Sequence, residues 1–147
     1  MVSAPAMARR VLLLVALALS GCGDGDREAR ARAAAEGYLQ AVKAKEPDKA
    51  MAFFAKAYFE NRTPTGWKAD LRLITTRLGA LQSYSLKSWT WRTDFVPPDS
   101  GTHVTLQYEV KYAKHTATET FVVFKPFARR EYRIIGHKIA SKGFMLE

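Results

Sequence analysis

The sequence predicts an α+β fold, in which N-terminal helices pack on a four-stranded antiparallel sheet. Three observations lead to this prediction. Apolar residues recur at helical spacing up to about residue 78, whereas alternation with a period of two begins beyond Gly79. Loops that contain glycine and proline then divide the second half into four strand-like segments. Helices that precede a run of strands usually cover one face of an antiparallel sheet.

Three helices are expected before Gly79. The segment 27–44 is rich in alanine, arginine and glutamate, which favour helix. Pro47 stands where a second, shorter helix would begin, because proline is favoured at the first helical position. A third helix is expected over 67–78, with Thr65 as its N-cap and Gly79 as its end.

Four strands are expected after Gly79, at residues 82–93, 102–112, 117–125 and 132–141. The second alternates most regularly, which indicates a strand with one buried face; its apolar positions are Val104, Leu106, Tyr108, Val110 and Tyr112. A turn over 113–116 predicts a hairpin with the third strand. The segment 94–101 is expected to be a loop, because its paired prolines cannot donate to a strand ladder.

Glu119 is the acidic residue that stands out in this pattern. If the hairpin loop is even-numbered, Tyr112 pairs with Ala117 and Val110 pairs with Glu119. Paired residues share a face, so Glu119 would lie on the apolar side, where a carboxylate is costly unless it is paired or hydrogen-bonded. A pocket is therefore predicted around Glu119, with Tyr84, Tyr108 and Tyr112 as its neighbours.

The role of Glu119 stays open at this point. It could be the polar anchor for a ligand, or a general base at the floor of the pocket. It could instead make a structural hydrogen bond, to Tyr84, to Tyr108 or to a helix-borne arginine such as Arg72 or Arg77. A β-bulge could also turn its side chain to solvent.

Trp89 and Trp91 share one face of the first expected strand, opposite Tyr84 and Leu86 under strict alternation. If the Leu86 face is buried, the two tryptophans face outward and could form an interaction patch. Packing against the tether or the first helix is the alternative, and both stay open.

No catalytic set is recognisable elsewhere in the chain. His103 and His115 are expected in solvent, whereas His137 is expected to be partly covered, on a face with Arg133, Ile135 and Ile139. Metal-ligand spacings, nucleophile motifs and phosphate-binding glycine loops do not occur in the sequence, so neither a metal nor a cofactor is predicted.

The N-terminus has the order of an export signal. Arg9 and Arg10 precede an apolar run over 11–19, which is too short to span a membrane, since that takes about 20 residues. The last residue of this run starts the sequence Leu19-Ser20-Gly21-Cys22, which resembles the bacterial lipobox. That resemblance implies cleavage between Gly21 and Cys22 and lipidation of Cys22. Translation from Met7 would give an equally good signal, and the choice of inner or outer membrane stays open.

These boundaries divide the chain into a signal peptide over 1–21, a lipidated N-terminus and tether over 22–27, and one domain over 28–147. Removal of the signal, which holds two arginines and no acid, lowers the formal net charge from +9 to +7. The positive charge is spread along the chain and no nucleic-acid-binding module is recognisable, so nucleic acid is not a predicted partner. Cys22 is the single cysteine, so no internal disulfide can form.

Several short segments resemble those of small exported bacterial proteins of unknown function with an NTF2-like fold, of the DUF4019 type. The segments are Trp67-Lys68-Ala69-Asp70-Leu71, 78–84 (LGALQSY), 116–123 (TATETFVV) and 132–136 (YRIIG). The resemblance implies a cystatin-like cone, in which three helices pack on a curved four-stranded sheet around a pocket. A fold of this kind hosts enzymes, ligand binders and docking modules, and so does not select a function.

Two functional hypotheses follow. The first is a non-enzymatic docking module, held at a bacterial membrane by lipid on Cys22, that binds a protein or another envelope component through Trp89 and Trp91. The alternative is a small-molecule binder or enzyme that uses an NTF2-like pocket with Glu119 as its polar anchor.

Overall fold

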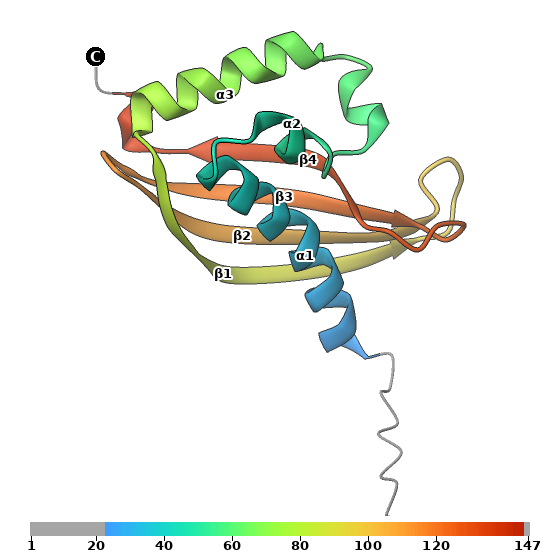
Figure 1. Cartoon of the computed structure of the whole chain (residues 1–147). Coiled ribbons are helices and arrows are strands. Elements are labelled where there is room, and N and C mark those ends of the chain that lie inside the picture. Colours follow the sequence, from blue (N-terminus) through green and yellow to red (C-terminus); the bar gives the residue numbers. More distant parts are fainter. Residues whose placement is uncertain (1–22, 146–147) are drawn as a thin grey trace, which may run out of the picture.

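A computed structural model describes residues 23–145 and shows an α+β domain, in which the helices lie on one face of a four-stranded antiparallel sheet (Figure 1). The elements are α1 (Asp24–Lys43), α2 (Pro47–Met51), the 3-10 helix η1 (Lys56–Phe59), α3 (Pro64–Leu78), β1 (Leu81–Asp94), β2 (Gly101–Tyr112), β3 (Thr116–Pro126), β4 (Arg133–Ala140) and the 3-10 helix η2 (Lys142–Phe144). The strands follow one another in the order β1-β2-β3-β4. The predicted fold class and the four-stranded antiparallel sheet are confirmed.

The expected second helix is interrupted by a contact with the sheet. It consists of the single turn of α2 and the separate η1, because the backbone between them pairs with β4. Ala55 donates its amide to the Ile134 carbonyl at 2.9 Å, and Ile134 donates to the Phe53 carbonyl at 2.9 Å. This extended stretch covers part of the β4 edge, which would otherwise expose unpaired backbone groups.

Two helix starts differ from the sequence prediction. The helix α3 begins at Pro64, and its N-cap is Thr63, not Thr65: the Thr63 hydroxyl accepts a hydrogen bond from the Gly66 amide at 3.0 Å. The helix α1 begins at Asp24, so the flexible tether predicted over 22–27 is wrong for its described part. Asp24 and Asp26 lie in the first turn of α1, where acidic side chains favour the helix.

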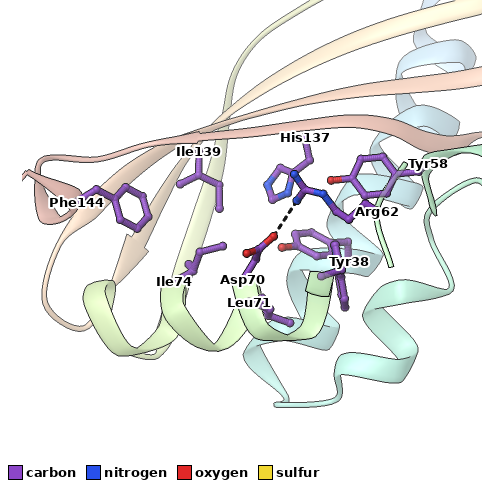
Figure 2. A pocket seen from close by; sticks show the side chains of 10 residues that line it. Tyr38, Tyr58, Arg62, Asp70, Leu71, Ile74, His137, Ile139 and Phe144 are labelled. Carbon is purple, nitrogen blue, oxygen red and sulfur yellow. Dashed lines mark hydrogen bonds and ion pairs between the residues drawn. The ribbon is translucent and has the colours of Figure 1, made fainter. Parts of the chain in front are cut away.

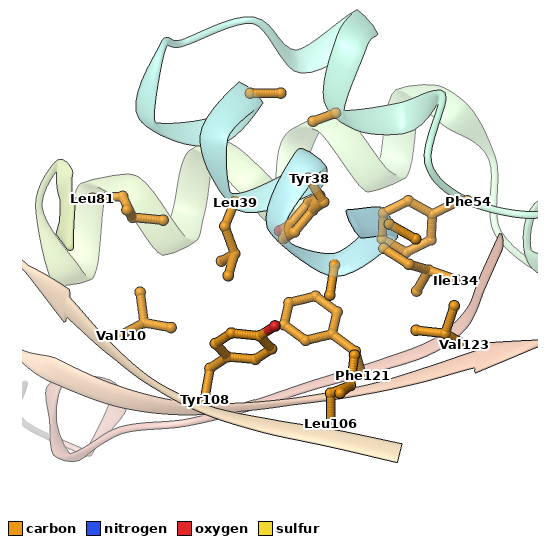
Figure 3. Packing of buried hydrophobic residues seen from close by; sticks show 14 of the residues in the cluster. Tyr38, Leu39, Phe54, Leu81, Leu106, Tyr108, Val110, Phe121, Val123 and Ile134 are labelled. Atoms are coloured by element: carbon orange, nitrogen blue, oxygen red, sulfur yellow. The ribbon is translucent and has the colours of Figure 1, made fainter. Parts of the chain in front are cut away.

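The hydrophobic core lies between α1 and the facing side of β2 and β3 (Figure 3). Small residues on α1, namely Ala31, Ala34 and Ala35, are buried and let this helix approach the sheet closely. Tyr38 is the large side chain of α1 in this layer, and its ring meets the Phe121 ring edge-on at 5.5 Å between centroids. Aromatic pairs of this geometry add stabilisation beyond the area they bury.

The hairpin between β2 and β3 has a tighter turn than expected. Tyr112 donates its amide to the His115 carbonyl at 3.0 Å, so only Ala113 and Lys114 form the loop. Glu119 therefore pairs with Tyr108, not with Val110. The predicted register is wrong by two residues, but an even shift keeps every side chain on its face. Glu119 accordingly points into the core, as predicted.

The described sheet has three register shifts; one lies at the start of β1, between Leu81 and Ser83, and the other two change faces that strict alternation would set farther along β1 and in β4. Lys87 has no partner in β2, since Leu86 pairs with Tyr108 and the next pair is Ser88 with Gln107. Ile135 is likewise unpaired, because Val122 pairs with Gly136 and Val123 with Ile134. A bulge inserts one residue, so all side chains beyond it exchange faces relative to those before it.

Gly101, the first residue of β2, is a point where two strands approach closely. A Cβ atom placed on it would lie 2.3 Å from the Lys125 carbonyl oxygen and 2.9 Å from the Pro126 Cα. Both are backbone atoms of β3, so they cannot move aside as a side chain would.

We expect Gly101→Ala to lower the free energy of unfolding by about 1–3 kcal/mol, the usual cost of overpacking a close contact. Urea denaturation of the purified domain measures this value. Gly25→Ala is the matched control, because no atom lies within 4 Å of its added Cβ; since alanine favours helix more than glycine does, this variant should be no less stable than the wild type. Equal stability of the two variants would contradict the close approach of β2 and β3.

Candidate functional site

Three side chains from adjacent strands form a buried hydrogen-bonded chain. Glu119 of β3 is fully buried, and the Tyr112 hydroxyl at the end of β2 donates to its Oε1. The Nε2 of His137, on β4, lies 2.8 Å from Glu119 Oε2. Both carboxyl oxygens therefore have a hydrogen-bond partner, which offsets the free-energy cost of burying an acid.

The phenols around Glu119 stay protonated. Burial and the neighbouring Glu119 carboxylate raise the pKa of Tyr112 far above its usual range. Burial, and then the same carboxylate, also raise the pKa of Tyr38. Since a negative phenolate is disfavoured next to a carboxylate, Tyr112 acts as a hydrogen-bond donor to Glu119.

The His137 ring packs against neighbouring aromatic rings. Its imidazole stacks on the Phe121 ring, with 4.6 Å between centroids and 7° between planes, and the Tyr38 ring meets it edge-on at 5.1 Å. When the Glu119 carboxylate is the acceptor, His137 carries a hydrogen on Nε2, so its other ring nitrogen, Nδ1, is not bound to the acid. The contact with Glu119 thus fixes the orientation of the ring.

His137 also lines a cavity of about 250 Å³ between β4 and α3 (Figure 2). The side chains around it are mostly aromatic and aliphatic: Tyr38, Tyr58, Trp67, Leu71, Ile74, Ile139 and Phe144, together with His137 and the pair Arg62 and Asp70. Arg62 Nη1 lies 3.1 Å from Asp70 Oδ2, which forms an ion pair at the cavity wall (Figure 2). The cavity therefore combines apolar walls with one imidazole and one ion pair.

Four larger hollows lie elsewhere on the described surface, and none of these four is lined by Glu119 or His137. The largest of these, about 560 Å³, lies beside α1 and α2 and is lined by Gly37, Gln40, Ala41, Ala44, Glu46, Lys49, Ala52 and Phe53. We therefore regard the cavity at His137 as the candidate site, because it alone among them adjoins the buried Tyr112–Glu119–His137 chain.

The four residues predicted for a pocket separate into two groups. Glu119 and Tyr112 come together, whereas Tyr84 and Tyr108 bind α1. The Tyr108 hydroxyl donates to Glu36 Oε1 at 3.0 Å, and the Tyr84 hydroxyl accepts from Gln40 Nε2 at 2.6 Å. The hydrogen bonds of Glu119 thus go to Tyr112 and His137, neither of which was an expected partner.

Sequence reasoning missed His137 because of the bulge at Ile135. The imidazole was expected on a face with Arg133 and Ile135, but the bulge places it on the core face with Ile134.

The expectation that His103 is in solvent is also wrong: it is 6% exposed, and its ring stacks on Phe124 at 4.4 Å. Burial, followed by the nearby Arg92 guanidinium, lowers the pKa of His103.

Trp89 and Trp91 lie on the core side of β1. They pair with Leu106 and Val104, which are fully buried, so the bulge at Lys87 overturns the expectation that they lie opposite Leu86. Trp89 packs against the core, and Trp91 is 43% exposed beneath the Arg27 guanidinium, 3.7 Å from its ring centre. The two tryptophans therefore do not form an exposed patch on the outer face of the sheet. Trp91 instead packs against the first helix, which was the alternative expectation.

Comparison with protein-family models, with curated proteins and with solved structures finds no match for this chain. Within residues 23–145, no group of three or more histidine, cysteine or acidic side chains could hold a metal ion. In the same range, no helix has both the length and the apolar character needed to cross a membrane. Gly21 and Cys22, the expected cleavage and lipidation residues, lie outside the described part.

We expect Glu119→Ala to lower the free energy of unfolding by about 3–5 kcal/mol, because it leaves the Tyr112 hydroxyl and the His137 imidazole buried without their shared partner. Glu119→Gln should cost less, since an amide of the same shape can still bond to both. Denaturant unfolding measures the difference.

Glu109→Gln is the control for this series, because Glu109 lies on the neighbouring strand with its side chain 41% exposed, 3.9 Å from Lys87. Its stability should change by less than about 0.5 kcal/mol. If Glu119→Ala were no more destabilising than this control, the buried hydrogen-bonded chain would be wrong.

Proposed function

We propose that this protein is a lipid-anchored domain of the bacterial cell envelope, with an NTF2-like architecture, that binds a small, partly apolar ligand in the cavity beside His137. The observation that carries the proposal is Glu119. A fully buried acid is costly, and here it is used to orient an imidazole at the wall of a cavity.

The lining of the cavity indicates the chemistry of the ligand. Tyr38, Tyr58 and Trp67 offer aromatic surface, and aliphatic side chains of α3 and β4 complete the walls. His137 supplies the polar contact. The cavity volume of about 250 Å³ is below the ~300 Å³ at which drug-sized pockets begin. These features favour a small ring or short-chain compound that carries one hydrogen-bonding group.

The NTF2-like architecture is part of this proposal. Support comes from the chain order, with helices first and a four-stranded meander after them, and from a cavity between a helix and the sheet. These are the features that the resemblance of the sequence implies. Fold alone does not select a function, so the cavity residues carry the argument.

The hydrogen bonds and ion pairs of the acidic side chains near the cavity favour ligand binding over catalysis. Both oxygens of Glu119 are engaged by Tyr112 and His137, so this buried acid has no unbonded oxygen to accept a substrate proton, and Asp70 Oδ2 is paired with Arg62. Docking of a protein through Trp89 and Trp91 is less favoured, because Trp89 packs against the core and Arg27 covers Trp91.

Ile74→Trp should abolish ligand binding, because the larger side chain would fill the cavity that Ile74 lines. Phenol is a suitable probe, and its binding can be followed through the NMR signals of the His137 ring. Leu73→Trp is the matched control: Leu73 directly precedes Ile74 on α3, and its side chain is 54% exposed. Binding that is equal in Ile74→Trp and the wild type would exclude this cavity as the site.

Cys22→Ala should move the protein from the membrane fraction to the soluble fraction and prevent incorporation of labelled palmitate. The physical reason is that several acyl chains on one cysteine hold a protein firmly, since each buried methylene contributes about 0.8 kcal/mol. Ser20→Ala keeps a small residue and the cysteine, and should leave anchoring unchanged. Labelling that persists without Cys22 would refute the anchor.

A further inference from the structure

Exposed apolar side chains gather at one end of the sheet. Phe95 and Val96, in the loop between β1 and β2, are 77% and 76% exposed, and Phe127, in the loop between β3 and β4, is 50% exposed. The Phe95 and Phe127 rings lie 5.6 Å apart, and the Phe127 amide donates to the Ser100 carbonyl at 3.3 Å. The two loops therefore form one surface, which we call the apolar loop end (Phe95, Val96 and Phe127).

Unpaired positive charge lies beside the apolar loop end. Arg129 and Arg130 are exposed, and neither guanidinium has an ion-pair partner among residues 23–145. Three acids lie nearby: Asp94 pairs with Arg92 at 3.0 Å, Glu131 pairs with Arg133 at 2.6 Å, and the exposed Asp99, in the loop between β1 and β2, has no ion-pair partner among residues 23–145. Arg129 and Arg130, which directly follow Phe127-Ala128, are thus free to meet an anionic external partner.

The N-terminus of α1 lies against the same end of the sheet. Arg27 covers the Trp91 ring, three residues before the end of β1, and Arg30 donates to the Arg130 carbonyl. Figure 1 shows the α1 N-terminus and both loops on the half of the molecule away from α3 and the C-terminal end. Because α1 begins at Asp24, only Gly23 separates this helix from Cys22.

We propose that the apolar loop end inserts into the headgroup region of an anionic phospholipid bilayer, next to the lipidated N-terminus. The inference rests on the proposed lipid anchor. With one residue between Cys22 and α1, the surface around the helix start must lie close to the bilayer. Exposed aromatic side chains gain by entering the interface, and arginines pair with phosphates through forked hydrogen bonds.

This contact would set the orientation of the domain. A domain held only by its lipidated N-terminus can rotate freely at the membrane. A second contact at a distance from this anchor fixes which side of the domain faces the membrane. The cavity at His137 is lined by α3, which lies toward the other end of the sheet from the apolar loop end (Figure 1). The bilayer would thus leave the cavity open to the aqueous side.

A single-cysteine experiment tests this inference on the full chain. Lipidation consumes the only native thiol, at Cys22, so Val96→Cys provides a unique thiol in an exposed loop. The lipidated protein is labelled with an environment-sensitive fluorophore and reconstituted in vesicles of phosphatidylglycerol and phosphatidylethanolamine. Brominated lipids in the same vesicles quench a fluorophore that lies at bilayer depth.

We expect a blue shift and quenching of the label at Val96→Cys, and neither effect at Leu73→Cys, whose exposed position on α3 is the control. Arg129→Glu combined with Arg130→Glu should reduce the quenching, because acidic side chains repel anionic headgroups. A label at residue 96 that behaves like the label at residue 73 overturns the inference.

Flotation of the same samples separates this inference from the anchor. Protein that floats with the vesicles while its label at residue 96 is unquenched retains the anchor and loses the membrane contact. Protein that neither floats nor shows quenching loses both. A blue shift that occurs in native membranes but not in protein-free vesicles assigns the apolar loop end to a protein partner instead.

Discussion

The hydrogen bonds of Glu119 are the constraint on which the rest of this site depends. A carboxyl group without access to water must find its partners inside the protein, and each partner here comes from a different strand: Tyr112 from β2 and His137 from β4. The requirement therefore fixes the register of three strands at one point. It also fixes the imidazole of His137, and through it the polar wall of the cavity.

The packing around this chain explains why the cavity is mainly apolar. Tyr38 from α1 and Phe121 from β3 cover two sides of the His137 ring, and Trp67 from α3 contacts Tyr38 edge-on, with 6.4 Å between their ring centres. Rings from α1, α3 and β3 and aliphatic side chains of α3 and β4 therefore surround the imidazole, and the space that they leave lies between α3 and β4 (Figure 2).

The two ends of the domain have different surface chemistry. The apolar loop end combines exposed aromatic residues with Arg129 and Arg130, and the start of α1 lies beside it. The side lined by α3 carries the cavity. A domain fixed at one end and open at the other can bind a ligand in the aqueous compartment while it remains at a surface. The proposed anchor and the proposed cavity therefore do not compete for the same face.

The sequence by itself determined the fold class, the four strands and the burial of Glu119. These features depend on local periodicity and on which face of a strand each side chain occupies. A register error of two residues leaves that face unchanged, as the β2–β3 hairpin shows. The tertiary structure decided the position of His137, the inward side of Trp89 and the interruption of the second helix. Each depends on a bulge or a long-range pairing, at Ile135, at Lys87 and between Ala55 and Ile134. One inserted residue exchanges the faces of a strand without any change in its composition, so no local pattern in the sequence records it.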